Sequence, residues 1–213
     1  MHRLCMLLLL SFPAFGQFVF GVKGGVPLSD AFDIARAPSP AREFSSATRW
    51  YTIGPTAELR LPFGLGIEFD ALYKRLSYTS SGSTASLSFH SGTTANSWEF
   101  PLLLKYRAPG ILARPFVLGG VSFHRLSDVK QFTVETFQTV TGDRKSTTSD
   151  PAELRDKSGQ GFVLGAGLEL HAPVIRISPE IRYTRWGSEN FLDSLNIFRS
   201  NRDQWEFLIG LTF

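Results

Sequence analysis

Two histidine–serine pairings are the residues of this chain whose types could supply a nucleophile with a base. His90 is followed directly by Ser91, and Ser122 is separated from His124 by one residue. Such a pair attacks an ester only when a third group orients the histidine. His90, however, lies in a Ser/Thr-rich stretch, where a solvated imidazole is the ordinary state. We therefore predict that the protein is not an enzyme and has no catalytic residues.

Metal and thiol chemistry have even less support. Asp150, Glu153 and Asp156 are spaced by three but lack the oxygen-rich loop pattern of a calcium site. Cys5 is the single cysteine and lies in the N-terminal leader described below, so disulfides and thiolate sites are excluded from the rest of the chain. We predict no metal and no cofactor.

The N-terminus has the pattern of a secretory signal peptide. Arg3 precedes an apolar run over residues 4–10, and Pro13 is followed by small residues before Gln17. Cys5 lies at the start of the apolar run, whereas a lipoprotein has its acylated cysteine at the end. The prediction is a signal peptide over residues 1–16 and one domain over residues 17–213. The net charge of +3 is too small to indicate nucleic acid binding.

The last ten residues, QWEFLIGLTF, alternate between two faces. Trp205, Phe207, Ile209 and Leu211 share one face with the terminal Phe213, while the other face is mainly polar or small. This period of two suits a strand with lipid on one side and a polar lumen on the other.

Seven further segments show strand character, and their connections alternate short and long. The eight segments cover residues 18–26, 50–61, 65–78, 97–107, 114–126, 161–170, 174–186 and 204–213. The stretch 79–96 is predicted as a polar connection. The longest connection, 127–160, could hold strand extensions around 132–141, and the facing of 114–126 stays open because both of its sides are apolar or glycine. The pattern predicts an all-β, eight-stranded antiparallel up-and-down transmembrane barrel with both termini on the periplasmic side.

Four segments together resemble the outer-membrane protein β-barrel domain family, with OmpA-like and PorT-like eight-stranded barrels as relatives. They are FVFGVKGG, ELRLPFGLGIEFDALYKR, WEFPLLLKYR and EFLIGLTF. The resemblance implies export to the outer membrane of a Gram-negative-type cell and insertion by the barrel-assembly machinery, with Phe213 as the assembly signal. We expect no peptidoglycan-binding domain after the barrel, so that activity of OmpA is not carried over.

Inward positions of the predicted strands carry acidic and basic residues in nearly equal number. Buried charges persist when they are paired and hydrogen-bonded, so we expect a salt-bridge network that plugs the lumen, with Glu206 next to Lys23. The alternative is a water-filled path, as in a narrow porin-like channel or transport accessory. The predicted lumen network is Lys23, Glu58, Arg60, Glu68, Asp70, Lys74, Glu99, Lys105, Glu169, Arg176, Glu180, Arg182 and Glu206.

Aromatic residues near the strand ends predict girdles at the two membrane interfaces. They are Trp50, Tyr51, Tyr73, Trp98, Tyr106, Tyr183, Trp186 and Trp205.

The predicted role is structural or surface-interacting, in a monomer that contacts outer-membrane lipid and lipopolysaccharide. The long loops are available to an extracellular partner. A soluble lipocalin-like binding barrel and an outer-membrane lipid hydrolase are the less favoured alternatives. Loop cations that could meet lipopolysaccharide phosphates are Arg36, Arg42, Arg144, Lys145, Arg199 and Arg202.

Overall fold

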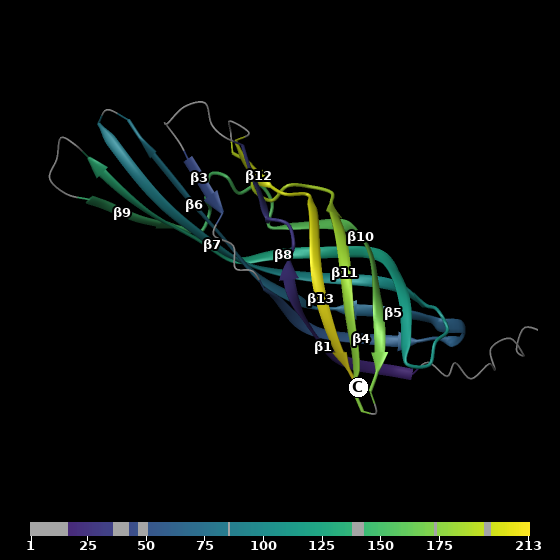
Figure 1. Cartoon of the computed structure of the whole chain (residues 1–213). Helices are drawn as coiled ribbons and strands as arrows, with labels where there is room; N and C mark the ends of the chain where they lie inside the picture. Colours follow the sequence, from purple (N-terminus) through teal and green to yellow (C-terminus); the bar gives the residue numbers. More distant parts are fainter. Residues whose placement is uncertain are drawn as a thin grey trace, which may run out of the picture.

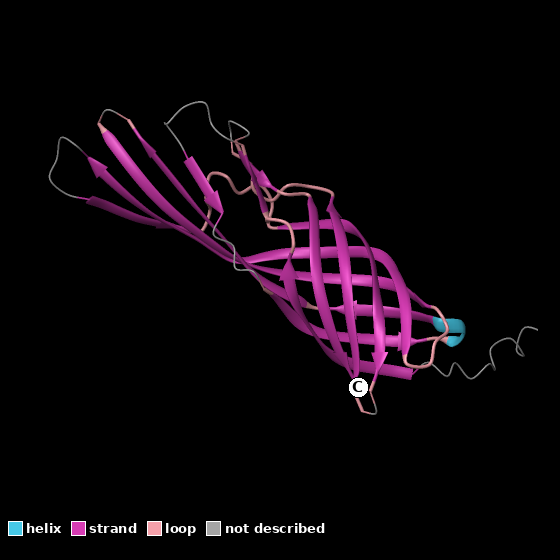
Figure 2. Ribbon diagram, viewed as in Figure 1, coloured by secondary structure: helices cyan, strands magenta, loops and turns pink. Residues whose placement is uncertain are grey.

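A single antiparallel sheet closes on itself to form a barrel (Figures 1 and 2). The computed structural model describes residues 17–35, 43–46, 51–84, 86–137, 143–172, 174–193 and 197–213. Within these ranges, eight crossings form the ring, because β5 and β6 follow one another and together make one crossing. In ring order they are β1 (Gln17–Pro27), β4 (Thr52–Arg60), β5 (Leu65–Asp70) with β6 (Leu72–Ser83), β7 (Leu87–Arg107), β8 (Ala113–Phe137), β10 (Ser158–His171), β11 (Arg176–Trp186) and β13 (Asp203–Thr212).

The ring closes where the first and last strands pair. β1 and β13 are antiparallel, with Val22 opposite Leu211 and Gly25 opposite Leu208. A Cβ atom on Gly25 would lie 2.0 Å from a backbone oxygen of β13. Since no side chain can occupy that space, glycine is required for the two strands to approach at this point.

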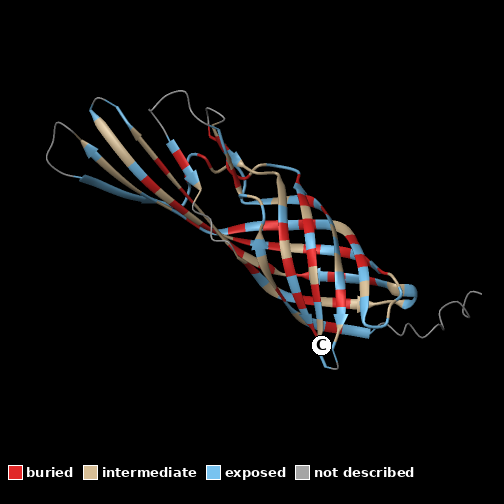
Figure 3. Ribbon diagram, viewed as in Figure 1, coloured by how far each residue is buried: buried red, intermediate tan, exposed pale blue. Residues whose placement is uncertain are grey.

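The two faces of each strand have opposite character, as the alternating colours of Figure 3 show. In β5, Leu65, Ile67 and Phe69 are exposed on the outside, whereas Glu68 and Asp70 are buried inside. This inversion of the usual soluble pattern, with apolar residues outside, suits a barrel surrounded by lipid. The open question of β8 is also answered, because Phe116 and Leu118 point inward.

Short turns join the strands at one end of the barrel. β4 and β5 are joined through η1 (Pro62–Gly64), in which Phe63 and Gly64 have positive φ angles of 63° and 80°. The C-terminus lies at the same end (Figure 2), where the Phe213 N–H donates to the Phe20 carbonyl at 3.0 Å. The predicted signal peptide, residues 1–16, lies outside the described residues.

At the other end, three strands run far beyond the barrel. β6, β7 and β8 continue as a sheet that is widened by β3 (Glu43–Ser46) on one edge and β9 (Asp143–Thr148) on the other (Figure 1). We call this extension the arm. The prediction of a connection over 79–96 was wrong, since residues 79–83 of β6 pair with residues 88–92 of β7 in a hairpin. The strand extension predicted from Phe132 is confirmed as far as Phe137.

A second small sheet lies over the mouth of the barrel. It pairs β2 (Phe32–Ile34) with β12 (Phe198–Ser200). β2 lies in the connection between β1 and β4, and β12 lies in the connection between β11 and β13. Within the described ranges, no helix has the length and apolar character needed to cross a membrane.

Candidate functional site

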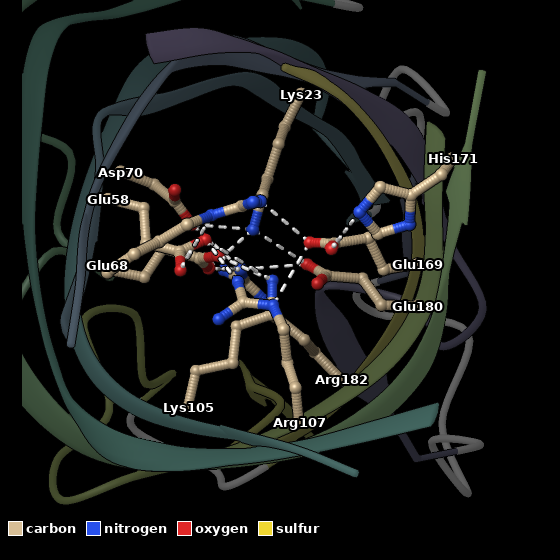
Figure 4. Close-up of polar contacts among 11 residues, drawn as sticks. Lys23, Glu58, Glu68, Asp70, Lys105, Arg107, Glu169, His171, Glu180 and Arg182 are labelled. Carbon is tan, nitrogen blue, oxygen red and sulfur yellow. Dashed lines mark hydrogen bonds and ion pairs between the residues drawn. The ribbon is translucent and has the colours of Figure 1, made fainter. Parts of the chain in front are cut away.

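The centre of the barrel is occupied by charged side chains from opposite walls. Lys23 extends from β1 and places its Nζ 2.5 Å from Glu68, 3.1 Å from Glu180 and 3.4 Å from Asp70 (Figure 4). Arg182 reaches in from β11 to the same three carboxylates, at 2.8 Å from Glu68, 2.8 Å from Asp70 and 2.7 Å from Glu180. All five residues are at most 2% exposed. Two cations and three carboxylates therefore bridge β1, β5 and β11 across the lumen.

A second layer lies toward the turn end. Arg107 of β7 is hydrogen-bonded to Glu58 and also to Glu169, 3.0 Å away. Arg60 reaches the same Glu169 at 2.8 Å, and Lys105 joins the two layers through Glu68 at 2.9 Å. Across both layers the side chains are five carboxylates and five Lys or Arg, so the charges balance.

A third group of charges lies toward the arm end of the lumen. Lys74 of β6 is paired with Glu99, lies 3.4 Å from Glu206, and donates to Gln204 at 3.1 Å. Thr52 also donates to Glu206 at 3.0 Å. The expected contact between Glu206 and Lys23 was wrong, because the stagger of the strands places Glu206 opposite Pro27.

Apolar side chains fill the remaining wall beside these charges. Leu103, Phe116, Leu118 and Val163 form one buried cluster, and the Lys105 Nζ lies 4.0 Å from the centre of the Phe116 ring. An ammonium over a ring face is attracted by the ring quadrupole. Since an eight-stranded interior is just wide enough for side chains, the apolar cluster and the ion pairs occupy the same narrow cross-section.

The mouth of the barrel is covered by a second apolar cluster, which we call the cap. Phe32, Phe44, Tyr78, Phe191 and Phe198 contact one another with ring centroids 4.5–6.5 Å apart. These residues come from β2, β3, β6, β12 and the segment before β12, and each is at most 5% exposed. The cap therefore joins three parts of the chain above the lumen: the connection between β1 and β4, strand β6, and the connection between β11 and β13.

Between the cap and Lys74 lies a small chamber of about 30 Å³. His124 and Trp186 line it, with their rings 4.3 Å apart in an edge-to-face arrangement. A site must offer roughly 10–15 Å³ of such volume for one water molecule. The chamber thus has room for about two waters and not for a larger ligand.

Most residues of the predicted lumen network lie in these layers. All except Arg60 and Arg176 are buried, and those two are half-buried at the turn end. Arg107 is absent from the predicted set although it bridges two carboxylates. The alternation of its own strand places it on the same face as Lys105, so the signal was present in the sequence.

Aromatic residues gather in two groups on the outer wall near the mouth. Tyr73 lies 6.4 Å from Tyr51 and 5.2 Å from Trp98, and Tyr183 lies 5.0 Å from Trp205. Tyr106 is exposed at the turn end, and Trp50 lies outside the described residues.

The prediction that Trp186 belongs to this girdle was wrong. Trp186 is 4% exposed and faces the chamber, because it shares its face of β11 with Arg182.

The two histidine–serine pairings do not come together. His90 and Ser91 are neighbours on β7 and point to opposite faces of the arm, while His124 faces Trp186 inside the mouth. Among the described residues, neither histidine is hydrogen-bonded to a serine, and no group of three His, Cys, Asp or Glu side chains could hold a metal ion.

A closed ring of eight antiparallel crossings, an apolar outer wall with aromatic groups, and a charged interior define a transmembrane β-barrel. The sequence model of the outer membrane protein beta-barrel domain family matches residues 11–187. The chain belongs to this family. It is an integral protein of the Gram-negative outer membrane, as the sequence predicted.

Several solved structures are similar to this chain. Neisserial surface protein A is 12% identical with a TM-score of 0.40, over 92% of this chain and 95% of that chain. Ail, the attachment invasion locus protein of Yersinia pestis, in complex with the heparin analogue sucrose octasulfate, is 10% identical with a TM-score of 0.37, over 92% and 99%. The translocator domain of the autotransporter NalP from Neisseria meningitidis is 11% identical with a TM-score of 0.33, over 100% and 93%. No curated protein sequence matches the chain.

Proposed function

We propose that the protein is a non-conducting outer-membrane barrel whose arm binds a partner at the cell surface, without enzymatic activity. The arm is the observation that carries this proposal. β8 has 25 residues and rises about 80 Å at 3.2–3.4 Å per residue. A tilted membrane strand needs only about 9–11 residues. β8 pairs with β10 of the barrel from Ala113 to Arg125, so the remaining 12 residues, about half of the strand, serve the arm.

The edges of the arm suit contact with another molecule. β9 pairs with β8 on one side only, and all six of its residues are exposed. Unpaired strand edges present N–H and C=O groups on which another strand can form hydrogen bonds. The charged Arg144 and Lys145 on β9 discourage indiscriminate pairing, because edge charges oppose aggregation.

The ion-paired interior supports the non-conducting half of the proposal. The ion-paired layers and the cap lie one above the other along the barrel axis, so an ion would have to displace both. We propose a monomeric barrel in contact with lipopolysaccharide and inserted by the barrel-assembly machinery.

Planar-bilayer recording tests the closed lumen. The refolded protein should show no stable unitary conductance, and neither should a variant without the arm, since the plug lies below it. A stable unitary conductance in the wild-type protein would overturn the plug and favour the narrow-channel alternative.

A trimmed arm tests the surface role. Residues 80–91 and residues 132–147 are each replaced by Asn-Gly, which forms the tight turn that a two-residue hairpin requires. The pairs Thr79–Gly92 and Gln131–Thr148 then flank the new turns, so strand register is kept. Vesicles that carry either protein are incubated with extracellular-matrix and envelope proteins, and bound proteins are quantified. A partner should bind the wild type and be lost from the trimmed variant; identical binding would refute the role of the arm.

A further inference from the structure

Three arginines surround a surface pocket on the rim of the barrel. Arg185 lies near the end of β11, Arg199 is in β12, and Arg202 directly precedes β13. They line a pocket of about 180 Å³. At roughly 10–15 Å³ for each water molecule, the pocket has room for a group several waters in size. It lies outside the lumen and takes no part in the plug.

Two of the arginines are held in place by carboxylates. The Arg185 Nη1 lies 2.5 Å from Asp203, and the Arg199 Nε lies 3.4 Å from Asp33. Each contact uses one nitrogen of a guanidinium that carries five N–H donors. The carboxylates therefore fix the two side chains while other donors of each remain for a ligand.

Arg202 differs from the other two. Its Nε donates to the Trp186 carbonyl at 3.0 Å, which orients the guanidinium. Among the residues that the structure describes, no carboxylate forms an ion pair with Arg202. The pocket also contains Glu189, so its formal charges balance, and recognition of an anion depends on the orientation of the guanidinium groups rather than on net charge.

The position of the pocket relative to the lipid head groups indicates which anion it can meet. Tyr183 and Trp205 lie on the outer wall, two residues from Arg185 and Asp203 along their strands, and the Tyr183 hydroxyl donates to Asp203 at 2.5 Å. Aromatic side chains of this kind mark the level of the lipid head groups. Two strand residues span about 6.6 Å, which places the arginines just above that level, at the extracellular surface.

We propose that this pocket binds a phosphate monoester, presented by the glycolipid of the outer leaflet. Guanidinium groups bind phosphate through paired, charge-assisted hydrogen bonds. The phosphates of lipopolysaccharide lie at the glycolipid head group, beside the outer wall on which Arg185 is exposed. This assigns one defined binding site for the lipopolysaccharide contact proposed above. It rests on that contact and not on the surface role of the arm.

The test uses the full chain, refolded in detergent, and native mass spectrometry to measure occupancy during a titration. The probes are lipopolysaccharide, the same lipopolysaccharide after enzymatic dephosphorylation, and inorganic phosphate as a competitor. The variants are Arg202→Gln alone and Arg185→Gln/Arg199→Gln/Arg202→Gln. The matched control is Lys130→Gln/Lys157→Gln, which removes two exposed cations that lie outside the pocket.

We expect Arg202→Gln to weaken binding about tenfold and the triple variant about a hundredfold or more, since each hydrogen bond to a charged group contributes roughly one factor of ten. The control variant should bind lipopolysaccharide as tightly as the wild type does. Dephosphorylated lipopolysaccharide should bind the wild type as weakly as intact lipopolysaccharide binds the triple variant. If the triple variant fails to fold, as judged by heat-modifiable mobility, Arg202→Gln decides, because it removes no ion pair among the described residues.

Three outcomes would overturn the proposal. The first is unchanged binding in the variants that fold, and the second is equal binding of dephosphorylated lipid. The third is competition by inorganic phosphate at the concentration of half-saturating lipopolysaccharide, which would show that the pocket takes the free anion rather than the lipid.

Discussion

Replacing Arg182 by methionine should destabilise the barrel strongly. Arg182 is 2% exposed and contacts three carboxylates at 2.7–2.8 Å. Methionine keeps much of the side-chain length. Among the described residues it leaves Lys23 as the one cation paired with Asp70 and Glu180, while Glu68 keeps both Lys23 and Lys105. Breaking a buried ion pair by removing one partner costs about 3–5 kcal/mol, because it leaves uncompensated charge in a low-dielectric interior.

The effect can be measured by urea unfolding of the protein in micelles, followed by far-ultraviolet circular dichroism. With a slope of about 2 kcal/mol per molar, a loss of about 4 kcal/mol lowers the midpoint by about 2 M. The exposed pair Lys130–Asp128, at 64% and 56% exposure, provides the control. Lys130→Met should barely move the midpoint, since solvent screens exposed pairs.

A compensating variant separates charge from packing. Arg182→Met/Glu180→Gln removes one cation and one anion, so the net charge of the layer returns to its original value. We expect the double variant to recover about half of the stability that Arg182→Met loses, or about 2 kcal/mol, because the effects of substitutions at contacting residues are not additive. The reasoning is refuted if Arg182→Met unfolds at the wild-type midpoint, or if the double variant loses the sum of the two single effects.

Three further predictions concern assembly and the cap. Phe213→Asp should lower the amount of protein inserted in the outer membrane, measured as heat-modifiable barrel; wild-type amounts would contradict the assembly role. Gly25→Val should prevent closure of the ring, because its Cβ would meet a backbone oxygen of β13 at 2.0 Å, whereas Gly24→Val, with its nearest atom at 3.9 Å, should fold and serves as the control. Phe198→Ala removes a ring that is 0% exposed and should cost the cap about 3–5 kcal/mol. Hydrogen exchange should then accelerate in β2 and β12 but not in β13, and uniform acceleration would argue against an independent cap.

The barrel could be predicted because its outer wall is solvated by lipid. Lipid requires an apolar residue at every second position, and that period is visible in Ile67 and Phe69 as clearly as in Glu68 and Asp70. Trp186 shares its parity on β11 with Arg182, so its burial follows from the alternation of the strand, whereas its residue type alone indicates a girdle position.

The arm and the details of the network could not be predicted for a different reason. Beyond the membrane a strand needs no apolar face, so the stretch 79–96, rich in Ser, Thr and Gly, has the composition of a loop although it forms a hairpin. The partner of Glu206 depends on the stagger between strands, which alternation does not determine. Which side of the segment 114–126 faces the lumen depends on other strands. Phe116 and Leu118 point inward because they pack against Leu103 and Val163.

The arm and the cap also differ in how they are encoded along the chain. The cap joins residues as distant as Phe32 and Phe198, so any change of length in one loop affects its fit with the others. The main strands of the arm are consecutive, from β6 to β9. Each of them pairs with the strand that precedes or follows it in the sequence. Removing equal numbers of residues from both sides of a hairpin shortens it without shifting the register below. The distance that the arm extends above the cell surface can therefore lengthen or shorten while the membrane-embedded part stays the same.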